Sequence, residues 1–399
     1  MRKIAWIIVI IVLIVGVVLL VKKPNQNTET QQQPIVKDVQ NIGSLSLFKN
    51  GLQASGIQAD DIGYHEFSSD GKYFFLSVFK KGGNPANKGY LINTSTGVVT
   101  DLPGVADRGV ADSRVMQLYT DGGITLYWPD VDQSKTYKVG DNAFFGSLSP
   151  DGKTYIVNTQ KGIQKIDIAS GEISSVSTKQ YDGAFAWFSD NNRMVGIQET
   201  NENLHEAGKG RQVGIWDVSA KTFTALPITL DQKSIRFAEW VIPDKVVRVN
   251  AGYDDGSFDY LVDVMNNKVT KVGDTSSGLM GGSLVTDKAW GMFATMLNPD
   301  GNLQVATIYR GTEKVSDVAL TGQYSRESVA IVNDHTLVYI RTAYGEESIT
   351  EQAIIKLDLK EGTETVVQNL PQKRAALSLA PDHKTWVASA GTQLFTGSL

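Results

Sequence analysis

The chain of 399 residues contains no cysteine. This absence excludes disulfide bonds, zinc sites built on thiolates, thiol nucleophiles and an acylated cysteine as a lipid anchor. Histidine is scarce as well, and no two of the four histidines have the spacing of metal ligands. We therefore predict no cofactor and no resident metal site.

The chain has no excess of positive charge: it contains 38 Lys and Arg residues and 43 Asp and Glu residues, which gives a net charge of −5. Proteins that bind nucleic acid neutralise phosphates with clustered Lys and Arg, so we expect no nucleic-acid partner. The sequence also lacks a Gly-x-Ser-x-Gly elbow, a His-Glu-x-x-His helix and a phosphate-binding loop. No catalytic residue is assigned, and we predict that the protein is not an enzyme.

Long apolar runs are missing everywhere except at the N terminus. Residues 4–21 carry no charge and consist mainly of Ile, Val and Leu, and Lys22, Lys23 and Pro24 follow them. This length is close to what a helix needs to cross a bilayer, and a cleavable signal peptide would have a shorter apolar run. We predict a single-pass anchor with residues 1–3 in the cytoplasm and the large domain outside the cell membrane.

The segment that follows is polar, with almost nothing apolar before Ile35. Such a segment cannot bury enough surface to offset the entropy lost on ordering, so residues 22–42 are predicted to be a flexible linker. Residues 43–399 form the remaining domain, which has short alternating apolar runs and no sustained helical period. The predicted fold class of this domain is all-β.

Two sequence marks recur along the domain. The first is a short apolar run that ends in a turn with Asp or Asp-Gly, which suits a tight hairpin. Its copies end at Asp70, Asp151, Asp190, Asp244, Asp287, Asp334 and Asp382, with a weaker copy at Asp112. The second mark is a strand end of the form apolar-Asp-apolar. Its clear copies lie at Asp167, Asp217, Asp263 and Asp358, with looser copies around Asn93, Asp130 and Arg310.

The two marks interleave with a mean period of about 44 residues, which is the length of a four-stranded propeller blade. We therefore predict a β-propeller and give the repeated Asp residues a structural role. The count favours eight blades, with seven as the alternative if the copy at Asp112 is misjudged. Residues 374–399 supply about three strands, and residues 44–48 are predicted to add the outer strand that closes the ring.

The clearest copy resembles the WD40-like repeat of bacterial TolB-type envelope propellers. It reads Gly146-Ser147-Leu148-Ser149-Pro150-Asp151-Gly152-Lys153 and continues to Ile166-Asp167-Ile168-Ala169-Ser170-Gly171. Trp216-Asp217 is similar to the WD dipeptide, although the Gly-His half of the eukaryotic signature is absent. The resemblance covers most of residues 60–399 and implies a binding platform more often than an enzyme.

A binding face is predicted where the second and third strands of the blades are joined. Four of these connections look long: residues 80–89, 198–211, 251–258 and 341–352. The alternative is that they are ordinary solvated loops. The candidate residues for binding a ligand or partner are Glu202, His205, Arg211, Tyr253, Asp254, Asp255 and Tyr344.

Two functions remain open at this point. The first is a protein-interaction or ligand-binding scaffold at the cell envelope, with a protein or a glycan as partner. The second is a propeller-fold lyase or hydrolase that acts on carbohydrate, because loop carboxylates are abundant although no spacing singles out a pair. Calcium is a weaker possibility at Asp130 with Asp132 or at Asp254 with Asp255, where the ligand sets are incomplete.

Overall fold

In the computed structural model, the structure describes residues 42–82, 87–102, 116–120, 123–139, 143–159, 161–178, 185–199, 211–228, 235–253, 256–274, 283–288, 290–297, 304–320, 322, 324–346 and 348–399. All of them belong to one compact unit, residues 37–399. The predicted N terminus (1–3), anchor (4–21) and nearly all of the linker (22–42) lie outside the described residues. Within the described ranges, no helix has both the length and the apolar character needed to span a bilayer.

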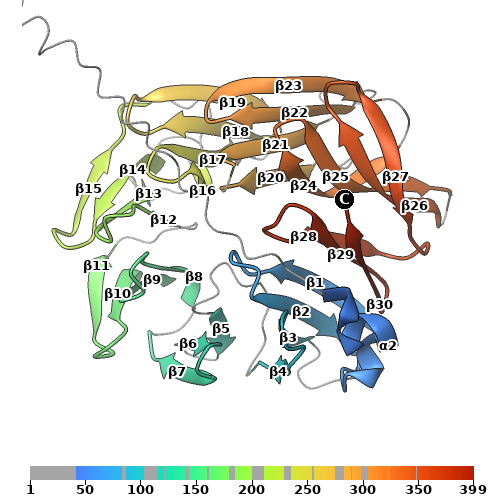
Figure 1. Ribbon diagram of the computed structural model, residues 1–399. Coiled ribbons are helices and arrows are strands. Elements are labelled where there is room, and N and C mark those ends of the chain that lie inside the picture. The colour runs from blue at the N-terminus through green and yellow to red at the C-terminus, as the bar shows by residue number, and fades with distance from the viewer. Residues whose placement is uncertain are drawn as a thin grey trace, which may run out of the picture. The chain divides into compact units, whose positions relative to one another are not determined.

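The described strands form eight antiparallel sheets, which we number as blades 1 to 8 in chain order (Figure 1). Blade 1 contains β1 (Asp61–Phe67), β2 (Tyr73–Phe79), β3 (Asn87–Asn93) and β4 (Val99–Asp101), and blade 2 contains β5 (Met116–Thr120), β6 (Gly123–Trp128) and β7 (Gln133–Tyr137). Blade 3 contains β8 (Ala143–Leu148), β9 (Thr154–Thr159), β10 (Gly162–Asp167) and β11 (Ile173–Ser177), and blade 4 contains β12 (Ala186–Trp187), β13 (Arg193–Glu199), β14 (Arg211–Asp217) and β15 (Thr222–Ala225).

Blade 5 contains β16 (Ile235–Ile242), β17 (Val246–Tyr253), β18 (Gly256–Asp263) and β19 (Lys268–Asp274), and blade 6 contains β20 (Ser283–Asp287), β21 (Met292–Leu297), β22 (Gln304–Arg310) and β23 (Glu313–Leu320). Blade 7 contains β24 (Ser325–Asn333), β25 (Thr336–Tyr344), β26 (Ile349–Asp358) and β27 (Thr363–Asn369), and blade 8 contains β28 (Ala375–Leu379), β29 (Thr385–Ala390) and β30 (Gln393–Ser398). Consecutive strands pair within each sheet, which is the blade arrangement that the repeats predicted.

The repeated Asp residues hold the turns, as predicted. Asp382 follows β28, and its carboxylate accepts hydrogen bonds from the backbone N–H groups of Lys384 and Thr385, both at 2.8 Å. Asp358 ends β26 and accepts from the N–H groups of the next turn, which lowers the pKa of its carboxyl. Each Asp carboxylate therefore accepts hydrogen bonds from turn N–H groups that have no partner in a neighbouring strand.

Blade 2 is described for three strands. The mark at Asp130 follows β6, so β6 and β7 correspond to the third and fourth strands of the other blades. The weak first mark around Asp112 lies outside the described residues.

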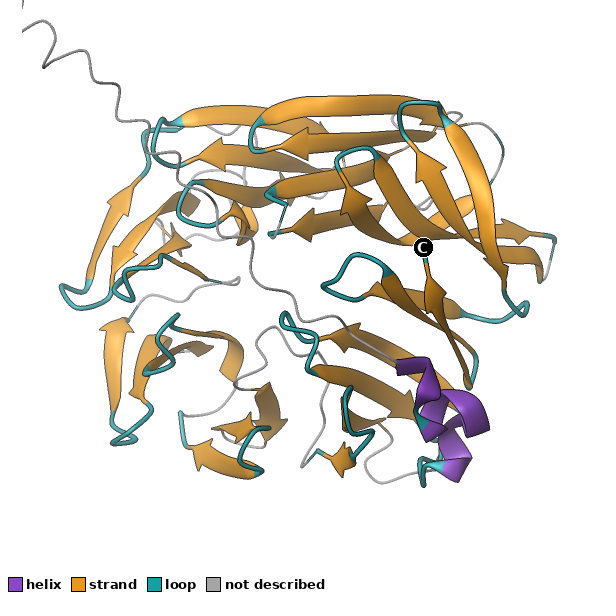
Figure 2. Cartoon of the chain, viewed as in Figure 1, coloured by secondary structure: helices purple, strands orange, loops and turns teal. Residues whose placement is uncertain are grey.

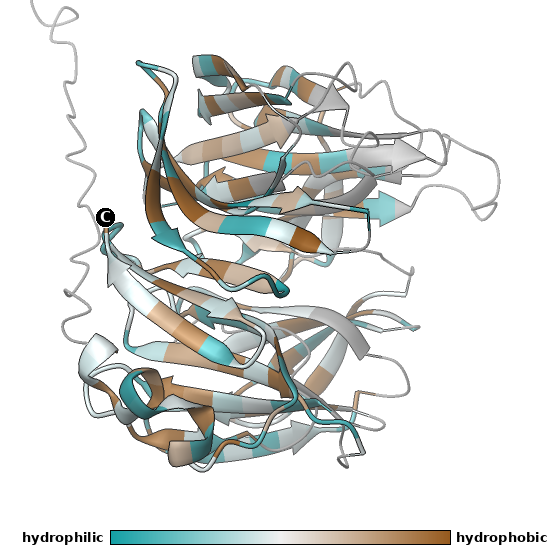
Figure 3. Ribbon diagram, turned by 90° about the vertical axis from the view of Figure 1, so that its right-hand side faces the viewer, coloured by the Kyte–Doolittle hydropathy of each residue, from teal (hydrophilic) through white to brown (hydrophobic). Residues whose placement is uncertain are grey.

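Hydrophobic clusters join each blade to the next. The middle strands are buried on both faces, so β2 reads as a nearly continuous apolar run, whereas the outer strand β7 is exposed along most of its length. Separate clusters link blades 1–2, 2–3, 3–5, 5–6, 6–7 and 7–8. A last cluster joins Val387 of blade 8 to Phe74 of blade 1, which closes the ring. Figure 3 shows that strongly hydrophobic residues run along the strands.

The predicted closing strand at residues 44–48 is wrong. This segment instead contributes to η1 (Ile42–Ser44) and to α2 (Ser46–Ala54), the helical part beside the strands in Figure 2. α2 is kinked at Gly51; Leu47 and Leu52 are buried in the cluster that joins blades 8 and 1, and Leu45 and Phe48 pack against it. Both helices contact β30, so helical residues cover part of the edge that a fourth strand would have paired.

Candidate functional site

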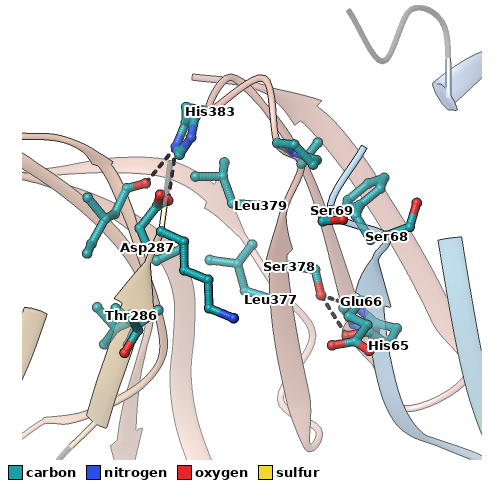
Figure 4. Close-up of a pocket in the computed structure, with 18 of the residues that line it drawn as sticks. His65, Glu66, Ser68, Ser69, Thr286, Asp287, Leu377, Ser378, Leu379 and His383 are labelled. Atoms are coloured by element: carbon teal, nitrogen blue, oxygen red, sulfur yellow. Dashed lines mark hydrogen bonds and ion pairs between the residues drawn. The ribbon is translucent and has the colours of Figure 1, made fainter. Parts of the chain in front are cut away.

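A cavity of about 460 Å³ lies between the first strands of four blades. Its walls come from β1, β20, β24 and β28 and from the turns that follow three of them (Figure 4). The lining consists of residues 64–69, 285–288, 329–331, 377–381 and 383. Blades 6, 7, 8 and 1 are consecutive around the ring, so the cavity belongs to one side of the central region.

The cavity lies at the opposite strand ends from the predicted binding face. In blade 1, Phe67 at the end of β1 pairs with Phe74 near the start of β2, whereas Asp61 pairs with Phe79 at the end of β2. The connection from β2 to β3 is therefore at the Asp61 end, and the cavity is near the Phe67 end. The binding face predicted from the sequence is therefore at the Asp61 end of the strands, and the cavity is at the other end.

The structure describes few of the predicted binding residues. Glu202, His205, Asp254 and Asp255 lie outside the described residues. Arg211 begins β14 and Tyr253 ends β17, but only their backbones are described. Tyr344 ends β25 with 60 % of its surface exposed. The proposed role of these residues remains a prediction.

Two of the four connections predicted to be long are short. Tyr253 at the end of β17 pairs with Gly256 at the start of β18, so this connection is a tight hairpin. Tyr344 pairs with Ile349, which leaves residues 345–348 between β25 and β26. The polar side chains suggested loops, but the backbone ladder continues because hydrogen bonding along a strand does not require apolar residues.

His383 is the most unusual residue of the cavity wall. It occupies the turn position that Gly71 and Gly152 occupy in blades 1 and 3, and its φ of 56° is in the left-handed region that glycine favours. Its Nδ1 lies 3.0 Å from the carbonyl of Ile331 and 3.4 Å from Oδ2 of Asp287. Because a carbonyl only accepts, Nδ1 carries the hydrogen.

The His383 ring also packs edge-on against Trp290, with 5.6 Å between the ring centroids. Together these contacts hold the imidazole between blades 6, 7 and 8 in a backbone conformation that costs energy. No signal in the sequence pointed to this wall, because a non-glycine residue follows the turn Asp in five of the seven clear copies of the mark.

His65 is buried in the opposite wall. Ser378 Oγ donates to the His65 carbonyl at 2.7 Å, so the contact of 2.8 Å between His65 Nδ1 and the same Oγ is a donation from the ring. The other nitrogen, Nε2, then accepts from Ser389 Oγ at 3.1 Å. Burial lowers the pKa of His65 to about 4. The ring is therefore neutral at pH 7 and joins blade 1 to blade 8.

The cavity also presents charged groups. Glu66 accepts a hydrogen bond from the Tyr64 hydroxyl, and Asp287 accepts one from the backbone N–H of Trp290 at 3.1 Å. Lys288 is exposed at the rim. Among the described residues, no three His, Asp or Glu side chains are grouped as metal ligands. The weaker calcium candidates Asp130 and Asp132 accept from the hydroxyls of Tyr73 and Tyr127, each at 2.8 Å.

Comparison with known proteins gives a fold and no family. No protein-family model matches the chain, and no curated protein matches it. Among solved structures, the chain is similar to the Dos1 propeller, with 12% identity, a TM-score of 0.55, and coverage of 86% of this chain and 92% of that one. It is also similar to dipeptidyl peptidase 4 from Porphyromonas gingivalis, with 13% identity, a TM-score of 0.54 and coverage of 86% and 58%.

TolB from Acinetobacter baumannii also matches, with 14% identity, a TM-score of 0.37, and coverage of 80% of this chain and 82% of that one. A match at this score carries no argument for a TolB-type relationship, which remains a prediction from the repeats. The likeness to the Dos1 propeller, together with the antiparallel sheets of three or four strands, shows that the described domain is a β-propeller.

Proposed function

We propose that this β-propeller is a binding module, displayed at the cell envelope by an N-terminal anchor, that holds a partner at the cavity between blades 6, 7, 8 and 1. The observation that carries the proposal is the cavity itself, whose wall residues are fixed by contacts between blades. Pre-organised walls reduce the entropy that ordering would cost when a partner binds.

The chemistry of the walls favours binding over nucleophilic catalysis. Ser378 and His65 are close enough to suggest a serine and its base, but the serine hydrogen points to a backbone carbonyl and the ring donates to the serine. A base must accept the hydrogen of its nucleophile, and a histidine with a pKa of about 4 is a weak base at neutral pH. This pair is therefore better suited to joining two blades.

The membrane part of the proposal rests on the sequence. Residues 4–21 are long and apolar enough for one crossing, and the polar segment after them would separate the propeller from the bilayer. A module placed in this way would meet proteins or glycans outside the membrane. The TolB-like repeat pattern is consistent with an envelope location.

An enzyme that acts on carbohydrate is the second candidate. The feature that favours it is the presence of two carboxylates, Glu66 and Asp287, on the walls of one cavity, since most glycosidases use such a pair. Turnover of plant or bacterial polysaccharides by the purified protein, lost in both Glu66→Gln and Asp287→Asn, would support this candidate over the binding module.

The binding module can be tested by blocking the cavity. Ser69 is exposed in the turn after β1 and lines the rim, so Ser69→Trp should place a large side chain over the opening. Ser95, exposed in the turn after β3 and outside the cavity, provides Ser95→Trp as the matched control.

The measurement is affinity capture of the tagged full-length protein from crosslinked membranes of its host, with mass spectrometry of the captured proteins and glycans. We expect a stoichiometric partner with the unmodified protein and the control, and at least about a tenfold loss with Ser69→Trp. Equal capture by both variants would show that the cavity is not the binding site.

A further inference from the structure

We infer that residues 42–57, here called the clasp, control the cavity: when docked they hold its blade 1 wall in place, and their release weakens binding there. The clasp comprises η1, α2 and the residues that follow as far as Ile57. The coupling between clasp and wall is a property of the fold, whereas its effect on a partner rests on the proposed function.

A phenylalanine of β2 connects the clasp to the cavity wall. The Phe48 ring of α2 and the Phe74 ring lie 6.0 Å apart, centroid to centroid. Phe74 is fully buried, and its ring lies 5.0 Å from the Phe67 ring and 5.5 Å from the His65 ring. Phe67 and His65 both line the cavity. A single side chain therefore separates the clasp from two residues of the wall.

The same wall carries the contact between blades 1 and 8. The His65 ring donates to Ser378 Oγ at 2.8 Å and accepts from Ser389 Oγ at 3.1 Å. Both serines belong to blade 8, so a shift of Phe74 that displaces the imidazole also disturbs these hydrogen bonds. In close-packed interiors such a displacement is transmitted to the neighbouring side chains.

Apolar contacts attach the clasp to the blades. Ile42, Leu47, Leu52 and Ile57 are each at most 5 % exposed and belong to the cluster that joins blades 8 and 1. Within the part of the chain that the structure describes, no hydrogen bond or ion pair links residues 42–57 to a strand, and the backbone hydrogen bonds of the clasp are internal. Docking therefore depends on burial of these side chains.

The helix of the clasp is weak on its own. α2 has nine residues, which is too short for a helix that is stable in isolation. Leu45 at its N-cap makes no side-chain cap hydrogen bond, and Gly51 has a non-helical φ of 82°. The clasp is therefore ordered when docked and unfolded when released. The predicted linker leads into it, so a pull along the tether acts first on the clasp.

His65 reports whether the clasp is docked. Burial is the main cause of its low pKa of about 4, so this pKa rises when water reaches the ring. β28 and β29, which pack against it from blade 8, contain no titratable residue. The titratable groups of the other adjacent elements are Asp61, Tyr64 and Glu66 of β1 itself, Tyr73 of β2 and Lys49 of α2.

The test follows the His65 imidazole by NMR in the full-length protein in detergent. Single His→Gln variants assign the signals of the four histidines. The clasp is weakened in the double variant Leu47→Ser with Leu52→Ser, and the ring contact alone is removed in Phe48→Ala. In both we expect His65 to titrate at a pH about one unit higher than in the unmodified protein.

Two further variants separate coupling from a general loss of stability. Phe48→Leu keeps an apolar side chain against Phe74 and should leave the His65 titration close to that of the unmodified protein. Phe223→Ala is the matched control, because Phe223 is a half-buried phenylalanine whose ring lies 5.1 Å from that of Trp216 in blade 4. It should destabilise the protein and leave the His65 titration unchanged.

The effect on a partner is measured by the same affinity capture from crosslinked membranes. A wall that the clasp no longer supports has to be ordered on binding, so the double variant should capture at least about fivefold less partner. Phe223→Ala should capture as much as the unmodified protein. If the double variant fails to fold, Phe48→Ala and Phe48→Leu still decide the question.

The inference is overturned by a His65 titration that is unchanged in either clasp variant, or by an equal rise in Phe223→Ala. Capture that is lost in Ser69→Trp and retained in both clasp variants would overturn the control of binding. Capture that is insensitive to Ser69→Trp would instead count against the proposed function, and the His65 titration would still decide whether clasp and wall are coupled.

Discussion

The first strands of blades 3 to 5 touch through tryptophan, whereas those of blades 6, 7, 8 and 1 leave a cavity. Trp187 donates its indole N–H to the Ser147 carbonyl of blade 3 at 3.2 Å, and Trp240 of blade 5 donates to the Trp187 carbonyl at 2.8 Å. Trp187 is three residues before its turn Asp and Trp240 is four before, whereas on the cavity side Ile331 and Leu379 are three before theirs.

The same repeat therefore builds both a tightly packed contact between blades and a cavity. A tryptophan fills the space between neighbouring strands and also satisfies a buried carbonyl. An isoleucine or leucine at the equivalent place is smaller and cannot donate. The turn marks fold each blade in the same way, so the side chains between the blades decide where a ligand could enter.

The largest loss of stability is expected where tryptophans pack between blades 3, 4 and 5. Trp240 is 5 % exposed and packs edge-on against Phe188 at 5.0 Å, so Trp240→Ala should lower the free energy of unfolding by about 3–5 kcal/mol. Trp240→Phe keeps most of the volume and loses the hydrogen bond, for a loss of about 1–2 kcal/mol. Urea unfolding followed by circular dichroism measures both, and equal losses would show that the hydrogen bond dominates.

The second largest effect is a loss of stability at low pH that arises from His65, on the cavity side of the ring. The pKa of His65 is lowered from 6.5 to about 4 by burial, so the folded state binds fewer protons than the unfolded state between these values. The stability from neutral His65 is present above about pH 6.5 and is lost progressively as pH falls to about 4, by about 3 kcal/mol in total.

The measurement for His65 is unfolding free energy from pH 7 to pH 4 in the unmodified protein and in His65→Gln, which cannot titrate there. The unmodified protein should lose more stability over this interval. If the two curves are parallel, or if NMR shows His65 titrating near pH 6.5, the buried neutral ring is not what joins blades 1 and 8.

The smallest effect is expected for the apolar wall of the cavity. Leu379 lines a cavity that already exists, so Leu379→Ala should enlarge this space without creating a new sealed void. We expect a loss of about 1–2 kcal/mol, below the usual range for a buried leucine. The same urea experiment applies, and a loss as large as that of Trp240→Ala would show that both sides of the ring are packed equally tightly.

Much of the fold could be predicted because its determinants are local. The Asp residues at 70, 151, 190, 244, 334 and 382 do lie between the first two strands of their blades, and Asp287 ends the first strand of its blade. Residues 374–399 do supply three strands. The helical segment Ser46–Ala54, kinked at Gly51, was missed because Leu45 and Leu47 alternate with serines as in a strand, whereas Leu47 and Leu52 are buried in the cluster that joins blades 8 and 1.

The candidate site was much harder to predict. Long polar connections suggested a face at one end of the strands, but the ladder extends through two of them, and the described cavity lies at the other end. His383 follows a turn Asp, as non-glycine residues do in most copies of the mark, and the sequence cannot tell what a turn residue contacts. That depends on Ile331 and Asp287, which belong to other blades.

The turns and strands could be predicted from the sequence because each depends on residues only a few positions apart, and the propeller because the same two marks recur about every 44 residues. Only the tertiary structure decided which blades are sealed and which enclose a cavity. His65 and Ser378 are 313 residues apart and meet because the ring closes. Such contacts depend on how the eight sheets pack side by side. The residue pattern along one strand does not specify which residues of the adjacent blade it will contact.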